Sequence, residues 1–343
     1  MKIGILTFHW ATNYGAILQA FALQAYLKSI GHDVKIINYK PARYDDTLYY
    51  FFRYRKFLQY RTYRCICRKE SFLKSFRSRH LIQTQRFSKE QDLTVEASMY
   101  DILITGSDQV LNPFFLQSGE RGGSTAYFLG FTNTVKKISY AASFGCTEYP
   151  VHLREKIKSL LTSFHAISVR EVTGQAIVAS LGFKDVELVP DPTLLLSADS
   201  YKVFVTCAYD EHYFAYMLHG EQARLDGIVH KFDSKINKST DECIENWLSN
   251  IYNSKGVITN SFHCVVFSLL FHKPFIVLLN QLENKGMNDR FYTILEKCGL
   301  ISRISTYEEF NQSLMNMSID WDKVDKVIDE IRTIGKNFLE ENL

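Results

Sequence analysis

The first forty residues constrain the fold more than any other stretch of the chain. Residues 2–8 form an apolar run that ends in a polar turn, after which apolar residues recur at helical spacing until Gly31. A second apolar run at 33–39 stops before Pro41. A strand, a helix and a second strand in direct succession predict a parallel sheet with helices on both faces.

The same alternation continues over most of the chain, which predicts an α/β fold in two halves. Residues 209–240 show no pattern that we can assign. We expect further strands at 100–105, 137–142, 166–170, 186–189, 201–208, 256–259 and 274–279, and further helices at 152–164, 172–181, 241–253, 262–272, 289–298 and 319–343.

The clearest break in the pattern is the Pro-Asp-Pro stretch at 190–192, which can continue neither a strand nor a helix. A chain of 343 residues also exceeds the roughly 250–300 residues at which a single core stops growing. We therefore predict a first domain at 1–190 with an insertion at 43–90, a shortened second domain at 191–317, and a C-terminal helix at 318–343.

Composition narrows the class of protein. Hydrophobic residues make up 46% and charged residues 22% of the chain, which is ordinary for a globular protein. No apolar run reaches the roughly 18–20 residues that span a bilayer, and we do not expect a signal peptide at the start. The seven cysteines are scattered and odd in number, which favours a reducing, cytoplasmic compartment. No metal-ligand spacing is present, so we expect no metal site.

The insertion differs from the rest of the chain in charge. Residues 43–89 hold thirteen Lys and Arg, three acidic residues and twelve Phe and Tyr, a net charge of +10 in a chain whose total is +3. Cations interleaved with aromatic rings are typical of helices on an anionic membrane surface. Solvated helices with their rings buried against the domain would have the same composition. No nucleic-acid motif accompanies the charge, so we expect no nucleic-acid partner.

Polar residues gather where four of the predicted strands end. Ligands of open α/β sheets bind outside the carboxyl ends of the strands, so these residues are candidates for one site. Three groups belong to the first half and one to the second, and a cleft between the halves would bring them together. The groups are Asn13-Tyr14, Ser107-Asp108-Gln109, Arg170-Glu171 and Asn260-Ser261-Phe262-His263.

Each group also has a purely structural explanation. A histidine at a helix start can be a hydrogen-bonded core residue, and Ser261 can cap the helix that follows. Asp108 can serve the turn that contains it, and Arg170 can be half of an ion pair. Asn13 and Tyr14 can form a turn and a cap.

The chemical explanation rests on the helix expected at 262–272. Its N-terminus would present free N–H groups and the positive end of the helix dipole, which suits an anion. His263 at this position can serve as a base near pH 7. Lys285 and Arg290 add two cations near another helix start. The chain has no phosphate-binding glycine loop, which argues against NTPases and ordinary dehydrogenases. These residues favour a site for a small phosphorylated or carboxylated anion.

Six blocks of the sequence, taken in order, resemble the polysaccharide pyruvyl transferase family. The resemblance covers nearly the whole chain except 43–90 and 209–240, and it implies two Rossmann-like domains facing a cleft, as in GT-B enzymes. The blocks are TFHWATNYGAILQAFALQAYLKSIGHDVKIINY, DILITGSDQVLNP, ISVRE, VPDPTLLL, VITNSFHCVVFSLLFHKPFIVL and NDRFYTILEKCGL.

The implied reaction moves the pyruvyl group of phosphoenolpyruvate onto a sugar diol of a polysaccharide precursor, giving a cyclic ketal and phosphate. Phosphoenolpyruvate is a co-substrate, and no cofactor is implied. The acceptor implied by the family is a glycan on a polyprenyl pyrophosphate carrier. Such an acceptor would give the basic insertion a purpose at the inner face of the membrane.

The resemblance also implies roles for individual residues. His263 matches the histidine that we expect to transfer the proton, and Asp108 is a candidate acid or orienter of a hydroxyl. Donor binding is implied for Arg170, Arg290, Ser261, Asn260 and Lys285. Acceptor binding is implied for Asn13, Tyr14 and Gln109.

Two departures from the family pattern matter. Some members have an arginine two residues before the histidine, where this chain has Ser261. One ligand expected for the carboxylate of the donor is therefore missing, and Arg290 or Lys285 would replace it. The second half is also short. Two alternatives therefore stay open: a GT-B-type glycosyltransferase that uses a nucleotide sugar, or a non-catalytic family member that acts as a scaffold.

Overall fold

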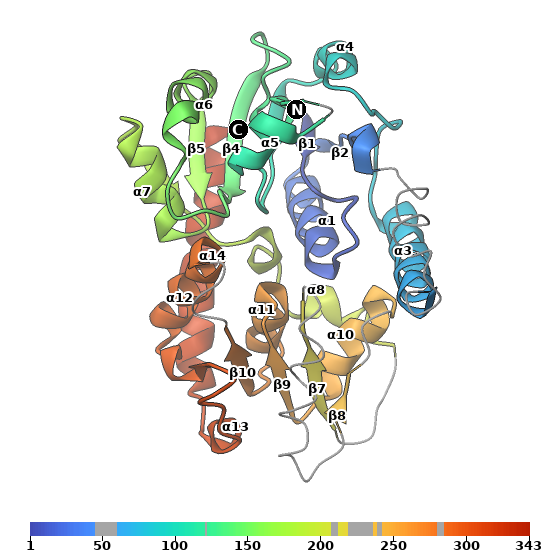
Figure 1. Cartoon of the computed structure of the whole chain (residues 1–343), viewed down its shortest axis with the longest axis vertical. Coiled ribbons are helices and arrows are strands. Elements are labelled where there is room, and N and C mark those ends of the chain that lie inside the picture. Colours follow the sequence, from blue (N-terminus) through green and yellow to red (C-terminus); the bar gives the residue numbers. More distant parts are fainter. Residues whose placement is uncertain (45–59, 121, 207–211, 219–235, 239–241, 280–284) are drawn as a thin grey trace. The chain divides into compact units, whose positions relative to one another are not determined.

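The computed structural model describes residues 1–44, 60–120, 122–206, 212–218, 236–238, 242–279 and 285–343 (Figure 1). Contacts within the chain divide it into two units, each with its own parallel sheet. Unit 1 comprises Met1–Ile66, Ser75–Leu195 and Ile331–Leu343, and unit 2 comprises Cys67–Lys74 and Leu196–Glu330.

Unit 1 is built on a six-stranded sheet in which all neighbouring strands are parallel. The chain first places β2 on one side of β1 and then returns to place β3 on the other side. This reversal is the topological switch point at which α/β sheets bind ligands. The strands in spatial order are β2 (Asp33–Ile36), β1 (Lys2–Leu6), β3 (Ile102–Thr105), β4 (Lys136–Ala142), β5 (Ala166–Val169) and β6 (Val186–Leu188).

Short connections and helices join these strands (Figure 1). The α-helices are α1 (Tyr14–Ser29), α3 (Tyr60–His80, of which Cys67–Lys74 belongs to unit 2), α4 (Leu93–Ala97), α5 (Pro113–Ser118), α6 (Arg154–Leu161) and α7 (Val172–Ser180). The 3₁₀ turns are η1 (Ala42–Tyr44), η3 (Glu90–Asp92), η4 (Ala126–Phe128), η5 (Val151–Leu153) and η6 (Pro192–Leu194).

Helix α1 has a cap at each end. The Asn13 side chain accepts hydrogen bonds from the N–H groups of Gly15 and Ala16, so it caps the N-terminus. Gly31 follows the C-terminus with φ +93°, a conformation that glycine adopts without strain. Most of α1 is buried, and the helix contacts β2 and η6.

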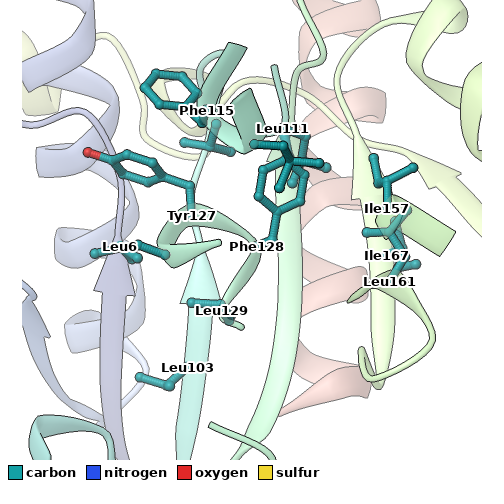
Figure 2. Close-up of a cluster of buried hydrophobic side chains, with 14 of the residues drawn as sticks. Leu6, Leu103, Leu111, Phe115, Tyr127, Phe128, Leu129, Ile157, Leu161 and Ile167 are labelled. Carbon is teal, nitrogen blue, oxygen red and sulfur yellow. The ribbon is translucent and has the colours of Figure 1, made fainter. Parts of the chain in front are cut away.

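One face of this sheet carries a large apolar cluster (Figure 2). Leu6 of β1, Leu103 of β3 and Ile167 of β5 supply side chains from the strands. Residues 110–131 fold over the sheet, and Tyr127 and Phe128 are buried there. Ile157 and Leu161 of α6 belong to the same cluster, which therefore packs α6 and residues 110–131 against the sheet.

Unit 2 has a five-stranded parallel sheet and a set of helices. Its strands in spatial order are β11 (Ile304–Ser305), β10 (Phe275–Leu278), β9 (Gly256–Thr259), β7 (Tyr213–Tyr216) and β8 (Ile236–Asn237). Its helices are α8 (Asp199–Lys202), α10 (Ile244–Asn253), α11 (Phe262–Leu270), α12 (Lys285–Cys298), η7 (Ile301–Arg303), α13 (Ser313–Asn316) and the first part of α14 (Trp321–Asn342).

The strand predicted at 201–208 is wrong over its described part. Residues Asp199–Lys202 form α8, and the chain to Thr206 contains no strand, while 207 and 208 lie outside the described residues. Tyr201 and Phe204 are buried and Val203 is 73% exposed, a helical spacing instead of a strand alternation. The apolar residues in this stretch follow one another so closely that the helical spacing was not evident from the sequence. The strands β7 and β8 lie instead in the stretch that the pattern left unassigned.

The basic insertion contains helix α3 (Tyr60–His80), and residues 81–89 after it are not helical. The apolar side chains Leu73 and Phe76 of α3 are buried, whereas Arg64, Arg68 and Lys74 are exposed. Residues 45–59, which contain much of the predicted aromatic and basic stretch, lie outside the described residues. No helix among the described residues is long and apolar enough to cross a membrane.

The C-terminal helix α14 returns to unit 1. The Nε of Arg332 donates a hydrogen bond to the carbonyl oxygen of Leu194 at 2.8 Å. The hydroxyl of Tyr26 in α1 donates to Glu340 at 2.7 Å. The end of the chain therefore packs on α1 and on the segment that contains η6.

Candidate active site

The residues that follow β3 and β5 converge on one buried guanidinium in unit 1. Nη1 of Arg170 lies 2.9 Å from Oδ2 of Asp191, and Nη2 lies 3.5 Å from Oδ1 of Asp108. Nε lies 3.5 Å from Oε2 of Glu171, and Nη1 also donates to the hydroxyl of Ser107 at 3.1 Å. The Arg170 side chain is 1% exposed. The two predicted groups at 107–109 and 170–171 thus meet, although β4 lies between β3 and β5 in the sheet.

Asp191 is the fixed point of this cluster. Its side chain is fully buried, and its Oδ1 accepts hydrogen bonds from both the backbone N–H and the hydroxyl of Thr193. Its Oδ2 accepts from Ser107 at 2.9 Å and from Arg170 at 2.9 Å. Both oxygens are therefore fully used, and burial without such partners would be costly.

The charges in the cluster reinforce one another. Burial by itself lowers the pKa of Arg170, but Asp108, Asp191 and Glu171 outweigh burial and leave that pKa above its ordinary value. Three carboxylates face one guanidinium.

Asp108 is the member of the cluster that reaches solvent, with a side chain that is 19% exposed. Its backbone has φ +81°, which is uncommon for a residue with a Cβ. The carbonyl oxygen of Asp108 accepts hydrogen bonds from the N–H groups of Ser143 and Val110, both at 2.8 Å. Strained residues held by their surroundings concentrate at functional sites.

The neighbouring strand is irregular at the same level. The pairing of β4 with β5 shifts register between Ser139 and Ala142, and Ala141 has φ +49°. The hydroxyl of Ser168 accepts the N–H of Ala141 and donates to the carbonyl of Ser139. This bulge carries Ala142 into a bridge with Asp108.

The three predicted acceptor residues lie at the same end of the sheet in structural positions. Asn13 caps α1, and Tyr14 is buried in the first turn of that helix. The side-chain oxygen of Gln109 accepts from Asn112 at 3.3 Å, and a Cβ at Gly145 would lie 2.4 Å from it. The acceptor role of these residues stays a prediction.

His263 lies in the first turn of α11 in unit 2 and is largely buried. Ser261 is the N-cap residue, but within the described chain its side chain accepts no capping bond from the first turn. Its own N–H donates instead to the hydroxyl of Thr259 at 2.9 Å. The first turn of α11 contains no acidic residue, so the positive end of the helix is not offset there.

Arg290 approaches the same helix start from α12. Its guanidinium lies 5.4 Å from the ring centroid of Phe262, which in turn lies 5.4 Å from the ring of His263. The structure therefore brings the predicted histidine and the predicted anion ligand into one neighbourhood of unit 2. Lys285 is the first residue of α12, and its side chain lies outside the described part.

Asn260 joins two strand ends. Its Oδ1 accepts the N–H of Leu218 at 2.6 Å, and its Nδ2 donates to the carbonyl oxygen of the same residue at 3.4 Å. The hydroxyl of Thr259 adds a hydrogen bond to the carbonyl of Tyr216 at 2.6 Å. These bonds fix the turn that carries His263. The donor-binding role of Asn260 stays a prediction.

Sequence reasoning missed Asp191 as a site residue and used its Pro-Asp-Pro stretch only as a domain break. A carboxylate between two prolines was the available signal, because such a rigid, short stretch can hold a charge in one place. Ser107 and Glu171 stood in the predicted groups without an assigned role. The contact of Ser107 with Arg170 depends on the order of β3, β4 and β5 in the sheet, whereas Glu171 is the next residue in the chain.

A separate surface pocket lies at the amino ends of the strands in the sheet of unit 1. Its lining includes Lys2 and Asp33, which begin β1 and β2, together with Tyr100. Ligands of such sheets bind at the carboxyl ends, so this pocket is not part of the site. Within the described ranges, no three His, Cys, Asp or Glu side chains group as metal ligands.

The sequence model of the polysaccharide pyruvyl transferases matches residues 13–281, which include the Arg170 cluster and the start of α11. The chain belongs to the polysaccharide pyruvyl transferase family. The resemblance read from the six sequence blocks is thereby confirmed, and the protein is classed as a transferase. Comparison with curated proteins finds no match.

Two solved structures show the fold of this transferase. A UDP-N-acetylglucosamine 2-epimerase from Rickettsia bellii matches with a TM-score of 0.55 and 8% identity, over 99% of this chain and 95% of the epimerase. AviGT4, a glycosyltransferase involved in avilamycin A biosynthesis, matches with a TM-score of 0.54 and 11% identity, over 100% of this chain and 97% of AviGT4. The predicted GT-B-like α/β class with a C-terminal helix is confirmed.

Proposed function

We propose that this transferase moves the pyruvyl group of phosphoenolpyruvate onto two hydroxyls of a sugar in a lipid-linked polysaccharide precursor. Membership of the family supports the transfer of a pyruvyl group. The observation that carries the choice of donor is the start of α11, where His263 and Arg290 gather around Phe262 with no acidic residue in the first turn. A donor with a phosphate and a carboxylate suits this positive environment.

The proton balance of the reaction assigns a task to His263. A proton adds to the methylene carbon of phosphoenolpyruvate, which becomes the methyl group of the ketal. The first sugar hydroxyl attacks the adjacent carbon and loses its proton, the bond from that carbon to the phosphate oxygen breaks, and phosphate leaves. The second hydroxyl then attacks the same carbon and loses its proton. Of the two hydroxyl protons, one replaces the proton given to the methylene carbon and the other leaves on the phosphate. We assign the delivery of the first proton to His263.

Asp108 is the proposed acceptor of a proton from the attacking hydroxyl. Its carboxylate is partly exposed at the carboxyl ends of β3 and β4, and Nη2 of Arg170 lies 3.5 Å from it. A positioned carboxylate in this place can orient a sugar hydroxyl and take up its proton as the new bond forms.

The test measures thermal unfolding with phosphoenolpyruvate, UDP or inorganic phosphate. A ligand that binds only the folded state at ~100 times its Kd stabilises it by about 2.7 kcal/mol. We expect the melting temperature to rise with phosphoenolpyruvate in the wild type and in His263→Asn, and not in Arg290→Lys. Lys297→Gln, at an exposed cation of the same helix α12, is the matched control and should keep the rise.

A second arm follows phosphate release from phosphoenolpyruvate with a panel of nitrophenyl glycosides as acceptors. We expect release with the wild type and its loss in His263→Asn, which keeps the donor but cannot deliver the proton. A thermal shift with UDP alone would move the assignment to a glycosyltransferase. Binding of neither ligand would refute the proposed donor site.

A further inference from the structure

A row of aromatic rings and cations follows the first strands of unit 1. Trp10 comes after β1, Tyr44 belongs to η1 after β2, and Phe114 belongs to α5 after β3. The ring centroids of Trp10 and Tyr44 lie 4.9 Å apart, with the planes tilted by 35°. The guanidinium of Arg43 lies 5.3 Å from the ring centroid of Tyr44 and 5.2 Å from that of Phe114. Nζ of Lys40 lies 5.6 Å from the ring centroid of Trp10. We call these five residues the aromatic row.

A second layer of rings supports the aromatic row from inside the protein. The ring of Phe8 contacts Trp10 and lies 4.9 Å from Phe115 and 4.6 Å from Tyr127 between centroids. Phe115 and Tyr127 are buried beside each other, with their centroids 5.2 Å apart (Figure 2). The indole N–H of Trp10 donates a hydrogen bond to the hydroxyl of Tyr127 at 2.9 Å. The buried layer therefore fixes the orientation of the Trp10 ring.

The outer side of the aromatic row reaches solvent. Phe114 is 42% exposed, and Trp10 and Tyr44 are partly exposed. Nη1 of Arg43 donates a hydrogen bond to the carbonyl oxygen of Ser118, which ties η1 to the end of α5. Large exposed rings that gather in one place mark surfaces for a ligand or a partner. The row is thus a supported surface that is available for binding.

The aromatic row lies at the same end of the sheet as Asp108. One short connection leads from Asp108 to Phe114, and the N–H of Leu111 fixes it by donating to the carbonyl oxygen of Ser143 at 3.1 Å. The side chain of Asn112 accepts the N–H of Phe114 at 2.9 Å. Ligands of such sheets bind outside the carboxyl ends, at the switch point beside β1. A ligand on the row would therefore belong to the candidate site of unit 1.

A pyranose ring suits this combination of groups. The C–H bonds on one face of a pyranose carry a small positive charge, which complements the negative face of an aromatic ring. The hydroxyls at the edge of the same pyranose can accept hydrogen bonds from a guanidinium or an ammonium group. A lipid tail or an apolar helix would instead cover the two cations without giving them a partner, which is costly. The mixture of rings and cations thus favours a sugar over a purely apolar ligand.

We propose that the rings of Trp10, Tyr44 and Phe114 form the surface on which a pyranose ring of the acceptor glycan stacks, with Arg43 and Lys40 at its hydroxyls. This inference rests on the proposed function, because it identifies the surface that binds the acceptor of that reaction. The row contributes affinity for the acceptor and takes no part in the transfer of protons. Its loss should therefore weaken the binding of the sugar and leave the binding of phosphoenolpyruvate unchanged.

The experiment measures saturation transfer by NMR from the aromatic protons of the protein to four methyl glycosides, those of glucose, galactose, mannose and N-acetylglucosamine. These probes have no aromatic group that could itself stack or be irradiated directly. We expect the ring C–H protons of at least one glycoside to receive more saturation than its O-methyl group. Tyr44→Leu and Phe114→Leu should raise the Kd of that glycoside at least about fivefold, whereas Tyr44→Phe and Phe114→Tyr should stay within about twofold.

The control is Phe164→Leu, at a partly buried phenylalanine of the same apolar cluster that precedes β5 and so lies at the amino end of the sheet. It should keep the wild-type Kd. Because Phe114 is exposed, Phe114→Leu keeps the inference testable even where Tyr44→Leu unfolds.

Phosphate release from phosphoenolpyruvate with the same glycosides gives a second readout. We expect both leucine variants to raise the KM for the glycoside at least about fivefold, and to leave kcat and the Kd of phosphoenolpyruvate within about twofold of the wild type. A merely structural role of the rings would lower kcat or weaken the binding of both ligands.

The possible outcomes separate the inference from the proposed function. Absence of saturation in all four glycosides overturns the inference, and so do leucine variants that keep the wild-type Kd. A raised Kd of phosphoenolpyruvate in these variants also overturns it, because the row would then hold the donor. Glycoside binding that depends on the row, in a wild type that does not bind phosphoenolpyruvate, refutes the proposed function and leaves the sugar-binding surface in place.

Discussion

His9 shows how one buried side chain can make the stability of unit 1 depend on pH. The imidazole is fully buried, with Nδ1 3.2 Å from the carbonyl oxygen of Thr7 and Nε2 3.1 Å from Oδ1 of Asn38. The pKa of His9 falls from 6.5 to about 4, chiefly because of burial and to a smaller extent because of Arg77 and Lys40, although the two hydrogen bonds oppose the change. The folded protein therefore holds His9 neutral where the unfolded chain binds a proton.

We predict that this histidine costs the wild type stability in acid. The pKa of His9 in the folded protein lies below its pKa in the unfolded chain. The stability that the neutral imidazole allows is therefore complete above pH 6.5 and is lost as the pH falls toward 4. The pKa difference corresponds to about 3 kcal/mol. Urea unfolding from pH 7 to pH 4 should show the wild type losing about that much more stability than His9→Gln. Parallel losses in the two proteins would contradict this prediction.

Burial also explains why Arg170 and its partners cannot be changed one at a time without a large cost in stability. Removing one partner of a buried ion pair costs about 3–5 kcal/mol, because the other charge stays buried. The hydrogen bonds that Asp191 accepts from Ser107, Arg170 and Thr193 place such a penalty on any change there. Ser107 is the mildest point at which the cluster can be altered.

At the scale of an element, α3 shows which part of the basic insertion is available to a partner. Leu73 and Phe76 are buried, so these apolar side chains are not available to insert into a bilayer. Arg64, Arg68 and Lys74 are exposed on the described part of the helix. The membrane contact predicted for 43–90 stays a prediction, and these residues make it an electrostatic one.

We therefore expect salt-sensitive binding to vesicles that contain phosphatidylglycerol, and none to neutral phosphatidylcholine vesicles. Each basic residue near an anionic surface contributes about 1 kcal/mol, and salt screens it. The pair Lys74→Glu and Lys89→Glu should weaken co-sedimentation, whereas Lys156→Glu, at an exposed lysine of α6, should not. Binding that survives high salt or the charge reversals would exclude this mode of contact.

At the scale of the whole molecule, the end of the chain completes the first unit. Residues Ile331–Leu343 belong to unit 1 with the first strands and helices. A Cβ at Gly335 of α14 would lie 2.6 Å from the hydroxyl of Tyr140 and 3.0 Å from two atoms of the Pro190 ring. This close approach places α14 directly against the segment that carries Asp191.

We predict that Gly335→Ala destabilises the protein despite the higher helix propensity of alanine. Overpacking typically costs about 1–3 kcal/mol, whereas the propensity gain is roughly 1 kcal/mol. Thermal unfolding should show a lower melting temperature for Gly335→Ala. Ile334→Ala, at a neighbouring side chain that is 41% exposed, should change it little. A stabilised Gly335→Ala protein would mean that the close packing at this glycine yields without cost.

The spacing of the apolar residues predicted those helices and strands in which that spacing is regular. The strand–helix–strand opening, β9 with α11, and the caps at Asn13 and Gly31 follow from local preferences that one segment carries alone. The pattern failed at Tyr201 and Phe204. These buried residues lie three positions apart, as on one face of a helix, but they were predicted to belong to a strand. It also failed at β7 and β8, which are short and lie beside stretches outside the described residues.

The sequence by itself determined the α/β class, the family and the polar residues at the strand ends, because each depends on neighbours along the chain. Only the tertiary structure decided that Arg170 faces three carboxylates, that Asp191 anchors it, and that Arg290 lies over Phe262 beside His263. Apart from the adjacent pairs Arg170–Glu171 and Phe262–His263, these contacts join residues far apart in the chain. Their existence depends on strand order and helix packing, which bring distant side chains together and which no local preference encodes.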